Sequence, residues 1–305
     1  NDTLFVPSGT TVYIDGGARV YGNIFTEGAH DVNIFGRGEV HPDGRGAGVW
    51  VRRSKNVRID GIVVSQLPIG QCDSVELTNV KSISYYGWGD GMDVFSSSNV
   101  ILDGVFCRNS DDCAAVYAST QGFKGGSNNV LVKNATLWAD VAHPINIGGH
   151  GDPNGMDTVQ NVTFRNIDIL DQAEKQIDYQ GCLAINPGDN TLVRNITFEN
   201  IRIEDFRNGQ LVNFRISFNP KYCVSTGRGI QNVLVKDVTY NGSGENLSII
   251  AGYDENHKIS GIRFVNLVVN GRKITDDMPG KPKWYKTGDM AGIFVGEHVE
   301  NLSFE

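Results

Sequence analysis

A short motif of alternating apolar and polar residues recurs along the chain. In each copy, two apolar residues separated by one other residue precede a central Asn, Gly or Asp, and a second apolar pair follows it. Because side chains alternate between the two faces of a strand, each copy predicts two short strands with one buried face, joined at a bend. The clearest copies begin at Asn56, Asn99, Asn129, Asn161, Asn195, Asn232 and Gly261.

A third apolar stretch precedes most of these copies, as at Val49–Val51, Ala115–Tyr117 and Ile145–Ile147. Three short strands per repeat, a period of about 20–40 residues and the lack of helical patterns are typical of a solenoid. A β-propeller has repeats of similar length but needs four strands per blade. We therefore predict an all-β, single-domain right-handed parallel β-helix of about nine or ten coils over residues 1–305. The repeated Asn residues are interpreted as turn residues stacked coil on coil.

Composition narrows the possible partners. The net charge is −8, which argues against nucleic acid as the natural partner because phosphate binding needs a basic surface. No apolar run reaches the ~18 residues of a membrane span, so none is expected. The sequence opens at Asn1 in what reads as a strand and shows no signal peptide, so we expect processing or excision from a longer chain. The five cysteines are interpreted as buried core residues, with a Cys107–Cys113 bridge as the weaker alternative.

Alignment of three consecutive coils places ionisable residues in one column. The alignment superimposes the last buried apolar residue of each third strand, which is Val94, Val116 or Ile147. Four residues before each of these positions stand Asp90, Asp112 and His143, and Asp111 precedes Asp112. Equivalent positions on neighbouring coils lie ~4.8 Å apart, so these groups should share a patch about 10 Å long.

Crowded carboxyls favour an active site. Like charges at such distances should raise the pKa of at least one carboxyl, and active sites use this effect. A structural ladder of Asp side chains, or a calcium site, is the alternative interpretation. Strict strand alternation would point Asp111 and Asp112 to opposite faces, so both reach the cleft only if the strand begins after them.

Three segments resemble, in order, the motifs of polygalacturonase-type glycoside hydrolases, which are Asn-Thr-Asp-Gly, Gly/Gln-Asp-Asp-Cys and Gly-His-Gly. The segments are Asp90–Val94, Ser110–Val116 and Ala142–Gly148. The related dextranase and isopullulanase family shares this fold and the set of aspartates. The resemblance implies a pectin-lyase-like β-helix that is secreted, periplasmic or at the cell surface and acts on a polysaccharide or oligosaccharide.

The resemblance also implies a mechanism. Asp111 would be the general acid, Asp90 and Asp112 would activate a water for single-step inversion, and His143 would hydrogen-bond the acid. Inversion requires the acid and base to lie about 6.5–9.5 Å apart, which neighbouring coils can supply. No cofactor and no metal are expected.

Two departures from the family pattern bear on the substrate. The third motif reads Ala142-His143-Pro144 rather than Gly-His-Gly. The family's Arg-Ile-Lys, which binds the galacturonate carboxylate, is missing, because the corresponding coil, Gly181–Asn186, is uncharged. Arg215 on a later coil substitutes for it only in part. A neutral or atypical α-glycan is therefore a better expectation than homogalacturonan, since an acidic sugar would lose its main anchor.

Aromatic and polar residues near the column are candidates for sugar binding, because sugar rings need flat apolar faces and hydrogen-bonding side chains. The candidate platforms are Trp88 and Tyr117, and the further candidates are Arg108, Lys124, His150 and Arg215. The loop Asp152–Asp157, with Asp152, Asn154 and Asp157, resembles the start of a calcium loop but is equally explained as a Gly turn. Residues 275–287 are a candidate wall that would close one end of the cleft.

Two other functions remain open at this stage. A polysaccharide lyase on the same fold would need calcium and a basic residue to abstract a proton, and the column lacks Arg and Lys. A non-catalytic carbohydrate-binding β-helix is also possible, because a fold alone does not imply activity.

Overall fold

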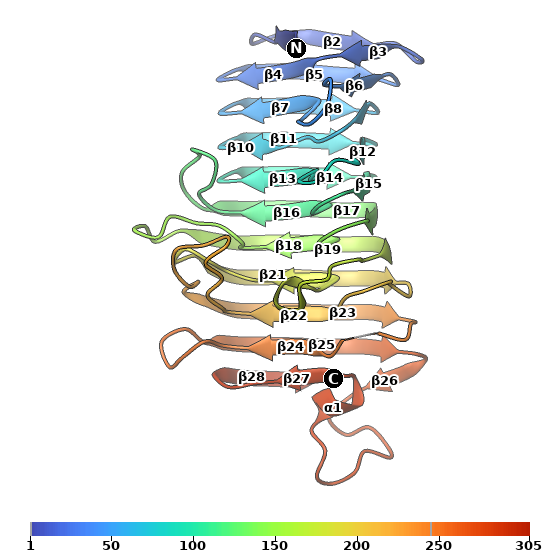
Figure 1. The fold of residues 1–305 in the computed structure, drawn as a ribbon, viewed down its shortest axis with the longest axis vertical. Coiled ribbons are helices and arrows are strands. Elements are labelled where there is room, and N and C mark those ends of the chain that lie inside the picture. The colour runs from blue at the N-terminus through green and yellow to red at the C-terminus, as the bar shows by residue number, and fades with distance from the viewer. Residues whose placement is uncertain (1, 245) are drawn as a thin grey trace.

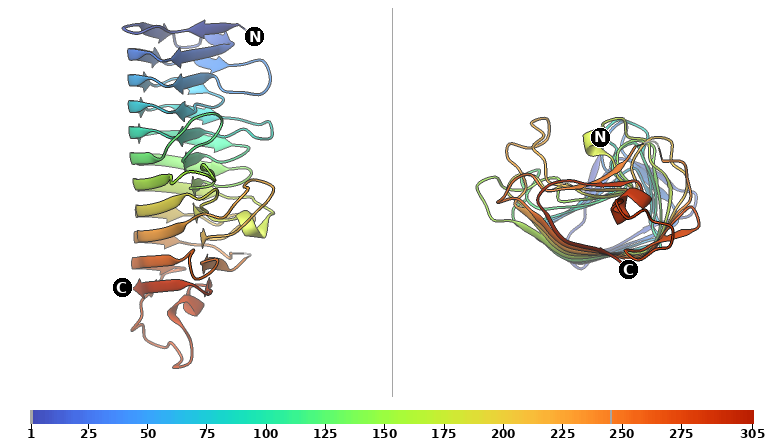
Figure 2. Two further views of the ribbon diagram at one scale, coloured as in Figure 1. Left: turned by 90° about the vertical axis from the view of Figure 1, so that its left-hand side faces the viewer. Right: turned by 90° about the horizontal axis from the view of Figure 1, so that it is seen from below.

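The computed structural model describes residues 2–244 and 246–305 and forms a right-handed parallel β-helix, in which successive coils stack along one axis (Figures 1 and 2). One face of the stack is an 11-stranded sheet, called the first sheet below. Its strands, in spatial order, are β1 (Thr3–Phe5), β4 (Asn23–Glu27), β7 (Val49–Arg52), β10 (Ile69–Gly70), β13 (Met92–Phe95), β16 (Ala114–Tyr117), β18 (Ile145–Ile147), β20 (Leu183–Ile185), β22 (Val212–Arg215), β24 (Ser248–Ala251) and β27 (Ile293–Val295).

A second, 17-stranded sheet forms the rest of the wall, and the coils pair in parallel within it. Among the strands of the described residues, only β26 pairs antiparallel, with the preceding strand β25. The strands are β2 (Thr11–Ile14), β3 (Arg19–Tyr21), β5 (His30–Gly36), β6 (Glu39–His41), β8 (Lys55–Asp60), β9 (Val63–Val64), β11 (Asp73–Thr78), β12 (Lys81–Ile83), β14 (Ser98–Asp103), β15 (Phe106–Asn109), β17 (Ser127–Ala139), β19 (Thr158–Asp171), β21 (Leu192–Ile203), β23 (Gly229–Tyr240), β25 (Ile259–Val269), β26 (Arg272–Ile274) and β28 (Val299–Phe304).

The predicted architecture is confirmed, with a larger number of coils than expected. The first sheet has 11 strands rather than nine or ten, because the first coils depart from the repeat motif on which the prediction depends. In later coils the two predicted strands of the motif join into one long strand, as in β17. The helical segments are the short α1 (Thr287–Met290) and the 3-10 turn η1 (Ile177–Tyr179), and neither is long or apolar enough to cross a membrane.

The core is a stack of inward-facing aliphatic and aromatic side chains. Val94, Val116 and Ile147 are aligned on consecutive coils and are buried. Burial of each such side chain stabilises the fold by about 1.5–3 kcal/mol. The five cysteines are free thiols and four of them are buried, so the core interpretation holds for these four and the Cys107–Cys113 bridge is wrong.

Asparagine ladders run along the outer surface, as the repeat predicted. Asn129 donates its side-chain amide to Asn99 at 2.7 Å, and Asn166 donates to Asn134 at the same distance of 2.7 Å. The ladder residues have positive φ angles, as at Asn134 with φ 55. Asn is one of the few residues other than Gly that adopts this conformation readily, and its amide bonds to the equivalent residue of the next coil.

The bend at Asn134 yields a first prediction. Asn134→Ala should lower the free energy of unfolding by about 1 kcal/mol more than Asn134→Gly, because both lose the ladder bond but only Ala is strained at positive φ. Urea denaturation of the two variants measures the difference. Equal losses would mean that the amide ladder alone, and not the backbone conformation, selects Asn here.

Candidate active site

Three neighbouring strands of the first sheet, β13, β16 and β18, position the column. Their aligned first residues are Met92, Ala114 and Ile145. Asp90, Asp112 and His143 each lie two residues before these strand starts. Backbone hydrogen bonds extend the pairing into this region, from the Gly91 N–H to the Asp112 carbonyl at 2.7 Å and from the Cys113 N–H to the His143 carbonyl at 2.9 Å. The structure therefore stacks the three residues as the alignment predicted.

The carboxyls of Asp90, Asp111 and Asp112 meet in a cleft of about 540 Å³. One oxygen from each lies within 4.8 Å of the others, which is closer than the about 6.5–9.5 Å expected for acid and base in an inverting enzyme. Asp111 and Asp112 both reach the cleft because β16 begins after them, at Ala114, so strand alternation does not separate them. The Asp112 N–H also donates to the Asp111 carboxylate at 3.0 Å.

Two of the three carboxyls are held partly protonated near neutral pH. Burial raises the pKa of Asp111 to about 8, and the nearby carboxylates of Asp112 and Asp90 add to this effect. Burial, aided by Asp112, raises the pKa of Asp90 to about 7. A solvated Asp has a pKa of about 3.9, so both groups hold a proton far more readily than usual, Asp111 more than Asp90.

The pKa of Asp112 is shifted in the opposite direction, below its usual value. Burial would raise its pKa, but the charge of His143 and its hydrogen bond to the carboxylate lower it below the usual value. His143 Nδ1 lies 2.7 Å from Oδ1 of Asp112. Tyr117 and Asn146 donate to Oδ2, from the hydroxyl at 2.5 Å and from the amide at 2.8 Å. The expected bond between His143 and the acid Asp111 is thus corrected: the imidazole binds Asp112, its neighbour in the column.

The buried pair of Asp112 and His143 also shifts the pKa of the histidine. Burial opposes a charge on His143, but the carboxylate of Asp112 raises the pKa of the imidazole above its usual value. His143 is fully buried, so the pair is shielded from solvent. Asp112 is therefore held in its ionised form by a fixed imidazole partner, whereas the carboxyls of Asp90 and Asp111 have no hydrogen-bonded histidine.

Sequence reasoning missed two polar residues of the cleft face. Asp93 and Asn146 occupy aligned positions on β13 and β18, with Ala115 between them on β16. Burial raises the pKa of Asp93 well above its usual value, which favours the neutral form of this carboxyl. The signal was present in the alternation, because Asp93 and Val94 point to opposite faces of one short strand and only Val94 faces the core.

Two loops outside the repeat motif form a wall of the cleft. Tyr179 of η1 stacks on Tyr222, with ring centroids 4.7 Å apart. Glu174 and Lys221 line the same cleft, and the Lys221 ammonium lies 4.8 Å from the centroid of the Tyr222 ring. The only signal for these residues was the extra length between motif copies. The proposed wall at residues 275–287 lies instead beyond the last coil, beside α1 (Figure 1).

The residues predicted to bind substrate fall into two groups. Trp88, Tyr117 and His150 line the cleft. Trp88 is 74% exposed, whereas Tyr117 is buried, stacks on Phe95 and donates its hydroxyl to Asp112. Tyr117 is therefore placed to orient a carboxylate rather than to offer an open face to a sugar.

The three predicted cations do not line the cleft. Each forms an ion pair on the surface: the pairs are Arg108–Asp140 at 2.9 Å, Lys124–Asp152 at 3.1 Å and Arg215–Asp178 at 2.6 Å. In the loop proposed to resemble a calcium site, the Asp157 carboxylate accepts the backbone N–H of Asp152 at 3.1 Å. The Gly155 N–H donates to the Asp152 carbonyl at 2.9 Å, as in a plain turn.

Comparisons with known proteins agree with these motifs. The sequence profile of glycosyl hydrolases family 28 matches residues 47–278. A polygalacturonase of Juniperus ashei is 26% identical over 216 residues, which cover 68% of this chain and 39% of that protein. A probable endo-xylogalacturonan hydrolase of Neosartorya fischeri is 29% identical over 164 residues, which cover 53% of this chain and 38% of that protein.

A comparison of structures agrees on the fold. The family 28 exopolygalacturonase of Yersinia enterocolitica superposes with a TM-score of 0.68 at 13% identity, over 98% of this chain and 70% of that one. The matches to the two curated relatives cover less than half of the length of each.

The electrostatics of the cleft lead to a second prediction. Asp112→Asn should destabilise the fold by about 3–5 kcal/mol, because it removes the carboxylate from the buried pair with His143 and from the hydrogen bonds of Tyr117 and Asn146. Asp93→Asn is the matched control, since burial favours the neutral form of that carboxyl and Asn has nearly the same shape; we expect a loss below about 1 kcal/mol. Urea denaturation at neutral pH measures both. Similar losses would contradict the charge states assigned to Asp112 and Asp93.

Proposed function

Because the chain belongs to glycosyl hydrolases family 28, we propose that it hydrolyses α-glycosidic bonds in a polysaccharide or oligosaccharide. The supporting observation is the trio Asp90, Asp111 and Asp112, whose carboxyl oxygens lie within 4.8 Å of one another and whose pKa values are pushed apart. Hydrolysis needs a proton for the leaving oxygen and a nucleophile for the anomeric carbon. Neighbouring carboxyls with different pKa values can provide both.

The environment of each carboxyl suggests its role. Asp111 has a pKa raised to about 8, so it carries a proton at neutral pH and serves as the general acid. Asp90 has a pKa raised to about 7, so a large share is ionised at neutral pH and can accept a proton from the attacking water. Asp112 stays anionic, because His143 and Tyr117 hold its charge; it orients the water and stabilises positive charge on the sugar in the transition state.

Single-step inversion is the stereochemical course that we propose. Asp90 and Asp112 lie together beside Asp111, so two carboxylates can hold one water opposite the leaving group. The short distance between the carboxyl oxygens, within 4.8 Å, favours a second candidate, because retaining enzymes have carboxyls about 5–5.5 Å apart. In that route Asp90 would attack the sugar directly, since Asp112 already accepts hydrogen bonds on both oxygens.

The proposed substrate is a neutral or atypical α-glycan rather than homogalacturonan. Among the described residues, the cleft lining includes five carboxyl side chains and one ammonium group, that of Lys221. Strand β20, where the family pattern would carry Arg-Ile-Lys, is uncharged and buried. Arg215 is already paired with Asp178. A polyanion would therefore find few cationic partners for its carboxylates.

The exposed ring of Trp88 at the edge of the cleft suits a sugar-binding platform, because sugar rings stack on flat apolar faces. Polysaccharides of this class are encountered outside the cytoplasm. We therefore place the protein among secreted, periplasmic or cell-surface enzymes.

The acid assignment leads to a third prediction. Asp111→Asn should lower the release of reducing ends by about 10²–10⁴-fold, because the leaving oxygen loses its proton donor. Product release is measured on neutral α-glucans, homogalacturonan and rhamnogalacturonans. Asp168→Asn is the matched control, since it removes an exposed carboxylate that pairs with Arg202 on the second sheet. This control should retain full activity.

Each result with the panel has a defined meaning. Saturated products from a neutral glycan, with the anomeric configuration inverted in early NMR spectra, support the proposal. Retained configuration would establish the double displacement, and preference for homogalacturonan would contradict the substrate class. An ultraviolet-absorbing double bond would identify a lyase. Glycan binding by the folded protein without any product would identify a binding module.

The pKa values provide a fourth prediction, on pH dependence. kcat/KM should fall above about pH 8, where Asp111 loses the proton that it donates, and below about pH 7, where Asp90 gains one. Initial rates across this range, with circular dichroism to confirm folding at each pH, measure the profile. A rate that keeps rising well above pH 8 would assign the proton donor to another group.

A further inference from the structure

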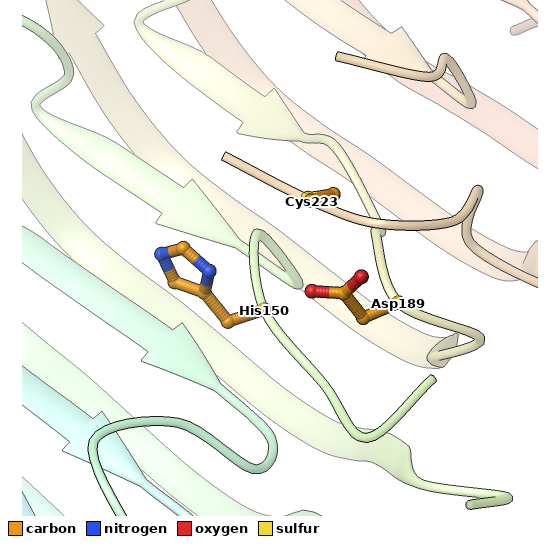
Figure 3. A group of neighbouring side chains, drawn as sticks. All are labelled: His150, Asp189 and Cys223. Atoms are coloured by element: carbon orange, nitrogen blue, oxygen red, sulfur yellow. The ribbon is translucent and has the colours of Figure 1, made fainter. Parts of the chain in front are cut away.

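A second group of ionisable side chains lies beside the cleft. One nitrogen of His150, one carboxylate oxygen of Asp189 and the sulfur of Cys223 lie within 4.8 Å of one another. The three side chains come from three separate segments of the chain, as Figure 3 shows. These segments follow β18, β20 and β22, so three successive coils contribute one residue each.

We propose that His150, Asp189 and Cys223 form a binding site for a divalent zinc-type ion. An imidazole nitrogen, a thiolate sulfur and a carboxylate oxygen are all ligands of zinc, which is borderline-soft. Calcium and magnesium take oxygen ligands almost exclusively, so the sulfur and nitrogen disfavour them. This site departs from the expectation of no metal, which was based on the cysteine spacing and could not reveal residues brought together from different coils.

The geometry is close to what such an ion requires. Ligand atoms around a tetrahedral zinc ion lie about 3–4 Å apart, given bonds of about 2.0–2.3 Å. Atoms already within 4.8 Å reach that spacing through small side-chain rotations. Three protein ligands leave a fourth position for water. Since His150 also lines the catalytic cleft, the ion would sit at the edge of that cleft.

The backbone around the group holds the ligands in place. Asp189 is buried, and its Oδ1 accepts the N–H groups of Val224 at 2.8 Å and Ser225 at 3.2 Å, which fixes the loop that carries Cys223. Because both bonds go to Oδ1, Oδ2 is left for an ion. At Gly188, a Cβ atom would lie only 2.2 Å from the Cys223 sulfur, so the glycine makes room for the thiol.

The thiol itself is available for metal binding. Cys223 is the only half-buried cysteine of the five, and its sulfur lies 3.3 Å from the Gly149 carbonyl, to which the S–H donates. A metal ion replaces this proton, because the thiolate is the form that binds metals. Binding therefore releases the thiol proton to solvent and joins three coils through one ion.

Titration of the reduced, chelator-treated protein with Cd²⁺ tests the proposal. Cadmium–thiolate bonds produce an ultraviolet charge-transfer band, which we expect to saturate at one equivalent per chain, and equilibrium dialysis with Zn²⁺ should also show one bound ion. Cys223→Ser should abolish the band, and His150→Gln should lose the bound zinc ion. His257→Gln alters a histidine that follows β24 and pairs with Asp254 at 2.7 Å, outside the proposed ligand set. It is the matched control and should change neither.

A variant of the three cleft carboxyls, Asp90, Asp111 and Asp112, provides the second control. Asp111→Asn should keep both the band and the stoichiometry, because an ion held by the catalytic carboxyls would have only oxygen ligands. The absence of a band in the wild type, its persistence in Cys223→Ser, or its loss in Asp111→Asn would each overturn the proposal. No sugar enters these measurements, so the outcome is independent of the proposed hydrolysis.

A measurement on the wild-type protein tests the site without depending on whether the variants fold. Iodoacetamide labels Cys223, the accessible thiol, and mass spectrometry reads the extent of labelling at that residue. Zn²⁺ should protect Cys223 from alkylation, and EDTA should restore labelling. Equal labelling with and without Zn²⁺ would contradict the site.

Discussion

The parallel register between neighbouring coils is the constraint on which the whole molecule depends. Hydrogen bonds of the first sheet align Val94, Val116 and Ile147, and the core buries all three. A slip of one residue would turn each inward side chain to the opposite face, so burial and hydrogen bonding fix the same register. The same register positions the candidate functional residues. Asp90, Asp112 and His143 become neighbours because each precedes one of these strands by the same number of residues.

The register also has an electrostatic cost, because it brings the buried carboxyls of Asp90, Asp111 and Asp112 close together. The structure resolves it by giving the carboxyls different partners. Asp112 accepts hydrogen bonds from His143, Tyr117 and Asn146, which lower its pKa and keep it ionised. Asp90 and Asp111 have no hydrogen-bonded histidine, and burial raises the pKa of each. Three chemically identical side chains thus acquire different protonation states through their surroundings alone.

The parts of the fold and site that repeat were predictable from the sequence. The strand pattern, the asparagine ladders and the column all follow from a period that the residues display. The contact of His143 with Asp112 was not predictable, because register places the histidine near two adjacent aspartates and only side-chain geometry decides between them. The wall formed by Tyr179 and Tyr222 lies in loops with no period, and so does Cys223. Loop residues of this kind come together only in the folded chain, so their contacts cannot be predicted from spacings in the sequence.

The proposed catalytic site and the proposed metal site both arise from the stacking of neighbouring coils, at opposite ends of the strands of the first sheet. The proposed catalytic residues precede β13, β16 and β18, whereas the proposed metal ligands follow β18, β20 and β22. Tyr117 connects them, because its hydroxyl donates to Asp112 and its ring lies edge-on against His150, with ring centroids 5.1 Å apart. An ion bound at His150 would restrain this ring. It would thereby restrain one of the hydrogen-bond donors to Asp112, so coil stacking would connect the proposed metal site to the proposed catalytic column.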